Sequence, residues 1–417
     1  MKIAVMTAGS HGDVAPFTGL GNGLARAGHD VVLVTHARFA PLAAEAGLDF
    51  HPLPVDPRET LASEAGQSLH RSTTGIGKLA RLIRMTRSLV GDMTEELIKA
   101  AEGCDFVLAA SPVAPLCHSI AEAMGLPSIG TYLQPLAATG EFAPPVTGTR
   151  SLGPWGNRAA GLAVASAVEA LFADAIRTVQ ARFGLPRTGT QARRRLRERR
   201  DWPILHGFSP LVVPRPRDWR PSLTIAGYWW PHEDPGPMVP ALADFLAAGA
   251  PPVLVTLGSA TVPDPDAVSA LITGALRDAG LRGVVQRGWS GLHAAGDDML
   301  TVDSVPHHFV FPHIAAVVHH AGAGTTAAGL RAGIPAVPIP VQFDEGFWGA
   351  RLKALGVAPA VLPLRRLSRS ALTATLVRAT TRSAYRDRAR HLAPRINAED
   401  GIAPVLHAIS RIADETA

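Results

Sequence analysis

Two glycines in the stretch His319-His320-Ala321-Gly322-Ala323-Gly324-Thr325-Thr326 stand between an apolar run and a predicted helix. Residues 315–319 have the character of a short buried strand, and we expect a helix from the turn to about Ala332, with Gly333 as its C-cap. The unpaired N–H groups and the dipole at a helix start attract anions, and small residues let an anion approach the backbone. The turn therefore predicts a diphosphate site with a further donor from histidine, although similar turns also occur where a helix merely packs on a strand.

Two adjacent carboxylates, Asp344 and Glu345, follow the next predicted strand, 336–339, and precede another helix. Because the carboxyl ends of parallel strands meet at one edge of a sheet, both side chains are expected near the same ligand. Carboxylates accept hydrogen bonds from sugar hydroxyls, but acidic residues also serve as helix N-caps, so both roles stay open. The turn at 319–326 has neither the P-loop lysine nor GxGxxG spacing, which argues against kinases and dinucleotide-dependent dehydrogenases.

The N-terminal residues form a second candidate site. Residues 3–6 predict a buried strand, 7–13 a loop, 14–27 a helix capped by Gly28, and 31–35 the next strand. Such a unit places its first loop at the carboxyl end of the first strand, where open α/β sheets bind ligands. This loop carries His11 and Asp13, and Asp13 is also a suitable N-cap for the helix.

Short apolar runs alternate with segments of helical spacing along most of the chain, which predicts parallel sheets covered by helices. At 417 residues the chain is long for one hydrophobic core, and the Pro- and Gly-rich stretch 227–237 is typical of a linker. We therefore expect an α/β fold in which two Rossmann-like domains face each other across a cleft. The expected units are a first domain at 1–227, a linker at 228–240, a second domain at 241–400, and a C-terminal helix at 401–417 that packs back on the first domain.

The composition is that of a globular protein, with 47% hydrophobic and 18% charged residues. No apolar run approaches the roughly 20 residues that a membrane-spanning helix needs, and the N-terminal run is too short for a signal peptide, which favours the cytoplasm. The net charge of +5 comes mostly from arginine. Its densest cluster, 193–200, lacks interleaved aromatic residues, so we expect a solvated helix face or loop and no nucleic-acid partner.

No metal site is expected. Cys104 and Cys117 have no metal-binding or disulfide spacing and are interpreted as buried thiols. The histidine doublets 307–308 and 319–320 offer at most one ligand each, because adjacent residues of a strand point to opposite faces of the sheet.

Several stretches in a fixed order carry a family resemblance. His320-x-Gly-x-Gly-Thr325, followed by Gly329-Leu-Arg-Ala-Gly-Ile-Pro335 and Pro340-Val-Gln-Phe-Asp344, resembles the donor motif of family 1 glycosyltransferases of the GT-B fold. Within that family the chain resembles the sterol glucosyltransferases and the bacterial enzymes that glycosylate antibiotics and other natural products. The supporting stretches, which extend the resemblance over nearly the whole chain, are residues 9–16, 208–216, 227–229, 256–259 and 305–307.

The resemblance implies a role for each part of the second domain. His320 and the backbone of Gly322, Ala323, Gly324 and Thr325 would bind the donor diphosphate, with Ser259 touching it from the interdomain side. Trp289 and the backbone near Val305 would form the base pocket, and Asp344 with Glu345 would contact the hexose. No metal or other cofactor is implied, since the nucleotide sugar is a co-substrate.

The same resemblance places the catalytic base in the first domain. Gly12-Asp13-Val14-Ala15-Pro16 corresponds to a segment in which relatives carry His or Asp, so Asp13 is the expected base and His11 the alternative. A carboxylate facing the cleft can take the proton of an acceptor hydroxyl as that oxygen attacks the anomeric carbon. Attack from the face opposite the leaving nucleotide would invert the anomeric centre.

Two residues depart from the family pattern. Glu345 stands where relatives carry Gln, and an ionised Glu accepts hydrogen bonds but donates none. Ala328 stands where plant relatives carry a ribose-binding Glu. The sequence therefore leaves UDP- and dTDP-sugars open as donors, and it leaves the sugar open as well.

The expected activity is transfer of a hexose to a hydroxyl of a hydrophobic small molecule, such as a natural product, sterol or polyketide, by a monomer or homodimer. Two alternatives are a nucleotide-sugar epimerase of the same fold and a non-catalytic nucleotide-sugar-binding protein. The segments 54–91 and 136–173 favour an acceptor groove, which an epimerase would not need. Gln134, Phe142 and Trp155 are candidate acceptor residues from their position alone.

Overall fold

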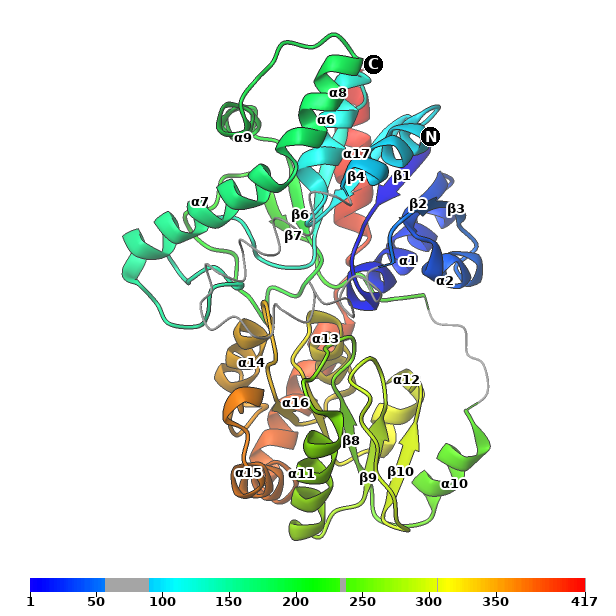
Figure 1. Ribbon diagram of the computed structural model, residues 1–417, viewed down its shortest axis with the longest axis vertical. Helices are drawn as coiled ribbons and strands as arrows, with labels where there is room; N and C mark the ends of the chain where they lie inside the picture. Colours follow the sequence, from blue (N-terminus) through cyan, green and yellow to red (C-terminus); the bar gives the residue numbers. More distant parts are fainter. Residues whose placement is uncertain (57–89, 233–237, 306, 417) are drawn as a thin grey trace.

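The computed structural model describes residues 1–56, 90–232, 238–305 and 307–416. Its two α/β halves lie one above the other in Figure 1, each with a parallel sheet between helices. Most of the segment 54–91, expected to contribute to an acceptor groove, lies outside the described residues. The expectation of an α/β fold with two parallel sheets is confirmed.

The first sheet has seven strands in the order β3-β2-β1-β4-β5-β6-β7, and every pair is parallel. The order reverses direction between β1 and β4, which is the place where such sheets bind ligands. The strands are β1 (Lys2–Met6), β2 (Asp30–His36), β3 (Asp49–Leu53), β4 (Phe106–Ala110), β5 (Ser128–Tyr132), β6 (Ile204–His206) and β7 (Leu223–Ile225).

Helices cover both faces of this sheet. Successive residues of β1 alternate between the two faces: Ile3 and Val5 pack in one buried cluster with α1, while Ala4 and Met6 pack in another with α6. The helices are α1 (His11–Arg26), α2 (Ala40–Glu45), residues 90–101, α6 (Ala114–Ala123), α7 (Gly153–Leu171), α8 (Ala173–Arg182) and α9 (Thr190–Arg199), with the 3₁₀ helix η1 (Ala37–Phe39).

The second sheet has five parallel strands in the order β10-β9-β8-β11-β12, with its reversal between β8 and β11. These strands are β8 (Val253–Thr256), β9 (Gly283–Gln286), β10 (Met299–Val302), β11 (Ala316–His319) and β12 (Ala336–Pro338). The surrounding helices are α10 (Pro240–Ala247), α11 (Pro265–Asp278), α12 (His307–Val310), α13 (Ala323–Ala332), α14 (Glu345–Ala354), α15 (Arg369–Thr381) and α16 (Ser383–Asn397), with η2 (Phe311–His313) and η3 (Leu364–Arg366).

The chain passes between the halves twice, and the two passages touch. The first follows β7, and the second joins α16 to the last helix, α17 (Ala403–Thr416). The Trp229 indole N–H donates to the Gly401 carbonyl at 2.9 Å, and the Ser209 hydroxyl donates to Glu399 Oε1 at 2.6 Å. Val405 and Ile409 of α17 are fully buried in the same cluster as α1, so the C-terminus returns to the first half (Figure 1).

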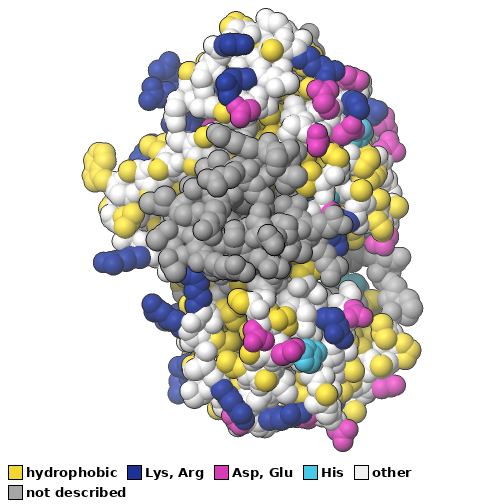
Figure 2. Space-filling model, viewed as in Figure 1, with side chains coloured by type: hydrophobic (Ala, Val, Ile, Leu, Met, Phe, Trp, Pro, Cys, Tyr) yellow, Lys and Arg dark blue, Asp and Glu magenta, His cyan; other side chains and the backbone are white. Residues whose placement is uncertain are grey.

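The arginine cluster expected on a solvated face is partly buried. Buried Arg193 of α9 donates to the Thr188 carbonyl at 2.9 Å, and half-buried Arg197 pairs with buried Glu169 of α7. On the described part of the face in Figure 2, Lys and Arg side chains are scattered among Asp and Glu rather than gathered in one basic surface. Cys104 and Cys117 are free and buried, as expected.

Within the described part of the chain, no single helix has the length and apolar character to cross a membrane. The bent pair α7 and α8, which meet at 53°, passes the same test of length and composition only when the two are taken together.

Candidate active site

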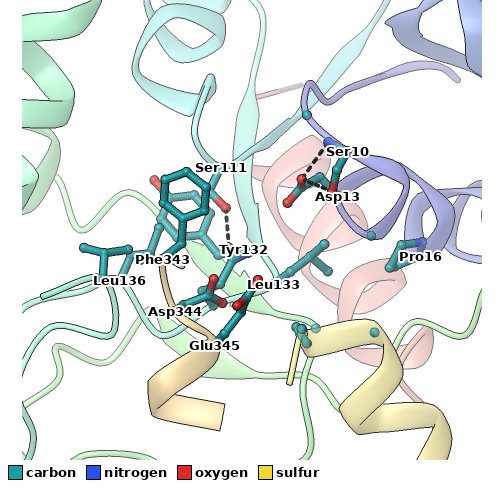
Figure 3. A pocket seen from close by; sticks show the side chains of 18 of the residues that line it. Ser10, Asp13, Pro16, Ser111, Tyr132, Leu133, Leu136, Phe343, Asp344 and Glu345 are labelled. Carbon is teal, nitrogen blue, oxygen red and sulfur yellow. Dashed lines mark hydrogen bonds between the residues drawn. The ribbon is translucent and has the colours of Figure 1, made fainter. Parts of the chain in front are cut away.

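A cleft of about 3280 Å³ lies between the two halves and is lined by residues of both. The loops that follow β1, β4 and β5 form its upper wall, and the loops that follow β8, β11 and β12 form its lower wall. Both walls are therefore made at the carboxyl ends of strands next to a reversal of strand order, where open α/β sheets bind ligands. Figure 3 shows carboxylates of the two halves directed into this space.

Asp13 lies in the first turn of α1, which begins three residues earlier than expected. Ser10 is the N-cap, and its backbone N–H and its hydroxyl both donate to Asp13 Oδ2, at 2.8 and 2.9 Å. Asp13 is therefore not the N-cap but the residue that bonds back to it, as in a capping box. The Gly9 N–H in turn donates to His36 Nε2 at 3.0 Å, which ties this loop to the end of β2.

The pKa of Asp13 reflects opposing influences. Burial raises it, while hydrogen bonds from Ser10 and from the Gln134 side chain lower it. Gln134 is itself held by the Ser111 hydroxyl, which donates to Gln134 Oε1 at 3.0 Å. Ser111 follows β4 and Gln134 follows β5, so the neighbouring strands β1, β4 and β5 bring the three side chains together. Sequence position suggested Gln134 as a cleft residue but gave no sign of its contact with Asp13.

His11, the alternative base, also lies in the first turn of α1, with its ring edge-on to Phe39 at 6.3 Å between centroids. Desolvation lowers the pKa of His11. His307, which the sequence did not single out as a binding residue, also lines the cleft and stacks on Phe311 at 4.7 Å. Burial lowers the pKa of His307 to about 4, with smaller contributions from His11 and His320, so both of these imidazoles lie within electrostatic reach of His307.

The glycine turn after β11 opens into α13 as the sequence predicts. Ala321 takes a left-handed conformation with φ of 66°, Gly322 is the N-cap, and the helix ends at Ala332 with Gly333 as its C-cap. The first intrahelical bond runs from the Thr326 N–H to the Gly322 carbonyl at 2.9 Å. The N–H groups of the three preceding residues, Ala323, Gly324 and Thr325, thus have no partner within the helix, and these residues line the cleft.

His320 is fixed beside this turn because two glycines leave room for its ring. A Cβ on Gly322 would lie 2.3 Å from His320 Nε2, and a Cβ on Gly258 would lie 2.6 Å from His320 Cε1. Burial lowers the pKa of His320 to about 4, so at neutral pH the ring is neutral and can donate one N–H. Its neighbour His319 points the other way and accepts the Ala321 N–H at Nδ1, at 3.2 Å, so one member of the doublet faces the cleft.

Asp344 faces the cleft from the second half. Its Oδ2 accepts the indole N–H of Trp348 at 2.7 Å, which fixes the orientation of the carboxylate. Burial raises the pKa of Asp344 to about 6, and the negative charge of Asp13 contributes to this rise. The proposed base and the proposed sugar ligand therefore interact electrostatically across the cleft.

Glu345 lines the cleft beside Asp344, and one of its carboxyl oxygens is bound by its own loop. Its Oε2 accepts the backbone N–H groups of Val341 and Gln342, at 2.6 and 2.8 Å, and the side chain is buried. Burial raises its pKa to about 8, so the carboxyl group is largely protonated at neutral pH. The structure thus commits one oxygen of Glu345 to its own loop rather than to a ligand.

Four further residues line the cleft: Trp289 and Val305, expected at the base, Ser259, expected at the diphosphate, and Ala328, at the ribose position of plant relatives. The sequence did not indicate Arg38, which reaches from the first half to lie 5.2 Å from the Trp289 ring centroid. Arg38 is held by Asp56 at 2.7 Å. Both halves therefore contribute to this end of the cleft.

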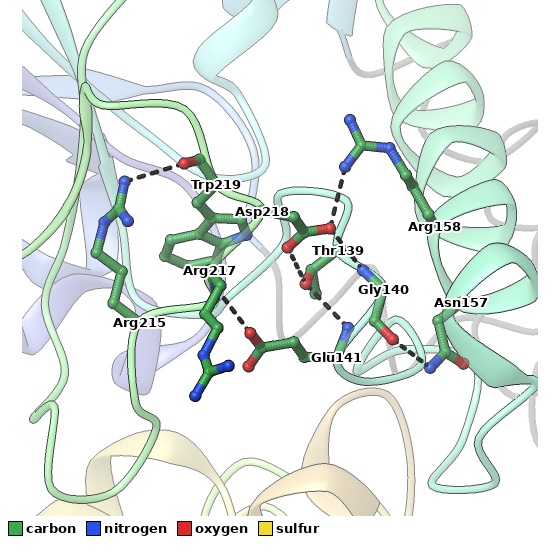
Figure 4. Close-up of polar contacts among 9 residues, drawn as sticks. All are labelled: Thr139, Gly140, Glu141, Asn157, Arg158, Arg215, Arg217, Asp218 and Trp219. Carbon is green, nitrogen blue, oxygen red and sulfur yellow. Dashed lines mark hydrogen bonds and ion pairs between the residues drawn. The ribbon is translucent and has the colours of Figure 1, made fainter.

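Two of the three candidate acceptor residues lie elsewhere. Gln134 lines the cleft, but the Phe142 ring packs on Phe347 of α14, 5.3 Å between centroids, and joins the two halves. The loop before Phe142 is held by Asp218, which accepts from the Thr139 hydroxyl, the Gly140 N–H and Arg158 at 2.6, 2.8 and 3.0 Å (Figure 4). Trp155 of α7 is 89% exposed and does not line the cleft.

Among residues 1–56, 90–232, 238–305 and 307–416, no group of three or more His, Cys, Asp or Glu side chains is arranged to hold a metal ion. His11, His307 and His320 all line the cleft.

Comparisons with known proteins identify the family. A model of the glycosyltransferase family 28 N-terminal domain matches residues 3–142, and a model of the C-terminal domain of erythromycin biosynthesis protein CIII-like proteins matches residues 284–409. The O-mycaminosyltylonolide 6-deoxyallosyltransferase of Streptomyces fradiae is 36% identical, over 96% of this chain and 95% of its own length. Sterol 3-beta-glucosyltransferase UGT80B1 of Arabidopsis thaliana is 29% identical, over 99% of this chain and 68% of its own length.

Solved structures share the fold over the whole chain. The glycosyltransferase SsfS6 of Streptomyces sp. SF2575, complexed with thymidine diphosphate, has a TM-score of 0.64 at 22% identity and covers 99% of both chains. The glycotransferase of kitacinnamycin has a TM-score of 0.69 at 19% identity and covers 98% of both chains. Membership of this family favours sugar transfer over the epimerase and binding-protein alternatives. The chain is a glycosyltransferase with the GT-B fold, and it belongs to the family of antibiotic and sterol glycosyltransferases.

Proposed function

We propose that this enzyme transfers a hexose, with inversion, from a dTDP- or UDP-sugar to a hydroxyl of a hydrophobic small molecule, with Asp13 as the base. The observation that carries the proposal is the interaction of Asp13 with Asp344 across the cleft. It supports an arrangement in which the acceptor hydroxyl lies against the first half and the sugar against the second.

In the proposed reaction Asp13 takes the proton of the acceptor hydroxyl as the oxygen attacks the anomeric carbon. The bond from that carbon to the diphosphate oxygen breaks, and the electron pair leaves with the nucleoside diphosphate. The N–H groups of Ala323, Gly324 and Thr325, with the His320 ring, would stabilise the charge that develops on the leaving group. The proton then passes from Asp13 to solvent. No resident metal or cofactor is part of this scheme.

Burial supports Asp13 as the base because it raises the pKa of the carboxylate and so strengthens its affinity for a proton. The two Ser10 donors converge on Oδ2, which leaves Oδ1 free of Ser10. His11 lies in the same first turn of α1, and desolvation lowers its pKa, which weakens the imidazole as a proton acceptor. We therefore prefer Asp13 to His11.

Among donors we favour dTDP-sugars. Ala328 lines the cleft where plant relatives carry a ribose-binding Glu, and a methyl group cannot hydrogen-bond a ribose 2′-hydroxyl. A 2′-deoxyribose has no such hydroxyl to satisfy. The glycosyltransferase VinC, whose structure is a complex with dTDP, aligns with the whole chain at a TM-score of 0.67 and 20% identity. The names of the relatives, a tylonolide glycosyltransferase and sterol glucosyltransferases, support a hydrophobic acceptor.

The test combines dTDP- and UDP-sugars with macrolide, sterol and phenolic acceptors and follows products by mass spectrometry. Asp13→Asn keeps an oxygen for the Ser10 N–H but removes the base, so we expect turnover to fall by about 10²–10⁴-fold with TDP affinity intact. Asp92→Asn, which changes an exposed carboxylate, is the matched control. Unchanged turnover in Asp13→Asn would remove Asp13 from the mechanism, and the absence of both transfer and donor hydrolysis in the native enzyme would refute the proposed activity.

A further inference from the structure

Phe343 combines an unfavourable backbone with an unfavourable environment for its side chain. Its φ is 48°, in the left-handed region that non-glycine residues seldom adopt, and its ring is 49% exposed. Such strain persists only where the surrounding structure enforces it, and it is concentrated at functional sites. Figure 3 shows the ring standing in the cleft, away from α14 and on the side of Leu136 and Ser111.

The loop around Phe343 is fixed on both sides of it. The Glu345 carboxyl group accepts the N–H groups of Val341 and Gln342 at 2.6 and 2.8 Å, and the Pro340 carbonyl accepts the Leu364 N–H at 3.0 Å. On the other side, Asp344 Oδ2 is bound to the Trp348 indole at 2.7 Å. Because the residues on both sides are fixed by these bonds, the chain turns at Phe343 itself, and its backbone conformation directs the side chain into the cleft.

The position of the Phe343 ring in the cleft indicates which substrate it can contact. Phe343 immediately precedes Asp344, which lies within electrostatic reach of Asp13, so the ring stands next to the point where the sugar and the acceptor would meet. The opposite wall at this point belongs to the first half and includes apolar Leu133 and Leu136. The diphosphate turn follows β11, whereas Phe343 lies in the loop after β12. An apolar ligand face placed between Phe343 and these leucines would remove the ring from water.

We propose that Phe343 is a binding residue for the apolar face of the acceptor, and that Glu345 is the positioning residue that holds its loop. This rests on the proposed function only for the identity of the ligand as acceptor. The ring would meet a fused-ring, aromatic or macrolactone surface rather than a polar one. The raised pKa of Glu345 agrees with a carboxyl group that serves its own loop.

The first experiment compares Phe343→Ala with Trp155→Ala, which removes another exposed aromatic ring outside the cleft. Acceptor KM is measured with O-mycaminosyltylonolide, cholesterol and 4-methylumbelliferone, beside hydrolysis of the donor without acceptor. We expect Phe343→Ala to raise acceptor KM about tenfold, equivalent to about 1.4 kcal/mol, and to leave donor hydrolysis and TDP affinity unchanged. Trp155→Ala should leave acceptor KM, donor hydrolysis and TDP affinity unchanged.

The second experiment separates positioning from sugar contact. Glu345→Gln keeps an oxygen for the Val341 and Gln342 N–H groups and should retain native acceptor KM, whereas Glu345→Ala should raise it. In a protein that already carries Phe343→Ala, Glu345→Ala should raise acceptor KM little further, because both changes act through the Phe343 ring. A larger effect of Glu345→Gln on donor KM than on acceptor KM would overturn the positioning role.

Two readouts need no turnover. Phe343→Gly should melt about 1–2 °C above Phe343→Ala, because glycine tolerates the left-handed conformation. Binding of 1-anilinonaphthalene-8-sulfonate to the TDP-loaded protein should weaken in Phe343→Ala and not in Trp155→Ala. Unchanged acceptor KM and unchanged dye binding in Phe343→Ala would refute the role of Phe343. Loss of all transfer and hydrolysis in the native enzyme would instead refute the proposed function, and the dye result would still decide the role of Phe343.

Discussion

Asp13 and Asp344 belong to different halves of the protein, and the negative charge of Asp13 raises the pKa of Asp344 across the cleft. Because such coupling is reciprocal, Asp344→Asn should make Asp13 easier to ionise. We expect the acid limb of the pH profile of kcat/KM to move to lower pH. A profile recorded with saturating donor checks this, and a limb that stays in place would mean that Asp13 does not control it.

The Ser111–Gln134–Asp13 chain predicts a graded effect on the base. Gln134→Leu removes a hydrogen bond that lowers the pKa of Asp13, so the acid limb should move to higher pH and kcat/KM should fall about tenfold near neutrality. Ser111→Ala frees Gln134 Oε1 and should act in the same direction but more weakly. TDP affinity should stay native in both, and a loss of TDP affinity would point to a general distortion of the cleft.

The glycine beside His320 predicts a steric effect on donor binding. Gly322→Ala places a Cβ 2.3 Å from His320 Nε2 and must displace the ring or the turn, so we expect TDP affinity to fall by about 10- to 100-fold. Gly329→Ala in the same helix meets Val317 at an ordinary 3.6 Å and is the control. Isothermal titration with TDP compares the two, and equal affinities would contradict the fixed placement of His320.

The buried carboxyl of Glu345 predicts a pH dependence of stability. Its pKa of about 8 in the folded protein lies above its ordinary value of 4.5, so the folded state holds the proton longer, and stability falls as pH rises between these values. Glu345→Gln cannot ionise and should escape this loss. In denaturant unfolding, the native enzyme and Glu345→Gln should have similar free energies of unfolding at pH 5. At pH 9 the free energy of unfolding of Glu345→Gln should be higher by up to about 4 kcal/mol. Equal slopes against pH in both proteins would show that Glu345 does not titrate in this way.

The packing of Phe142 predicts that replacing this residue lowers the free energy of unfolding and leaves acceptor binding nearly unchanged. Phe142→Ala removes the ring that packs on Phe347 between the two halves, and the expected loss is about 2–4 kcal/mol because the contact is partly exposed. Acceptor KM should change by less than about twofold. Thermal unfolding and acceptor kinetics decide between the two roles, and a selective rise in acceptor KM would restore Phe142 to the acceptor site.

The diphosphate turn was predictable because its signals are local. An apolar run, small residues and Gly333 specify the strand, turn and helix end without help from the rest of the chain. The start of α1 was placed three residues late, because His11 and Gly12 are poor helix formers and the bonds between Ser10 and Asp13 that fix the helix start are not visible in composition.

The remaining site residues depend on tertiary structure. Gln134 reaches Asp13 only because β5 lies next to β4 and β4 next to β1. The hydrogen bond from the Val341 N–H to Glu345 depends on the backbone conformation of the loop, and the packing of Phe142 on Phe347 depends on how the two halves meet. Neither contact follows from the spacing of residues in the sequence. For the same reason the sequence did not indicate Arg38, and it placed His307 and Phe343 in motifs without assigning them a contact in the cleft.

The two passages of chain between the halves make contact at Trp229 with Gly401, and Glu399 of the second passage accepts the Ser209 hydroxyl of the first half. Two bodies joined by adjacent connections can rotate about the line through them but resist sliding and twisting. A rotation about this seam would widen or narrow the cleft as a single angular movement. Such a rotation would change the contacts made by both walls of the cleft together.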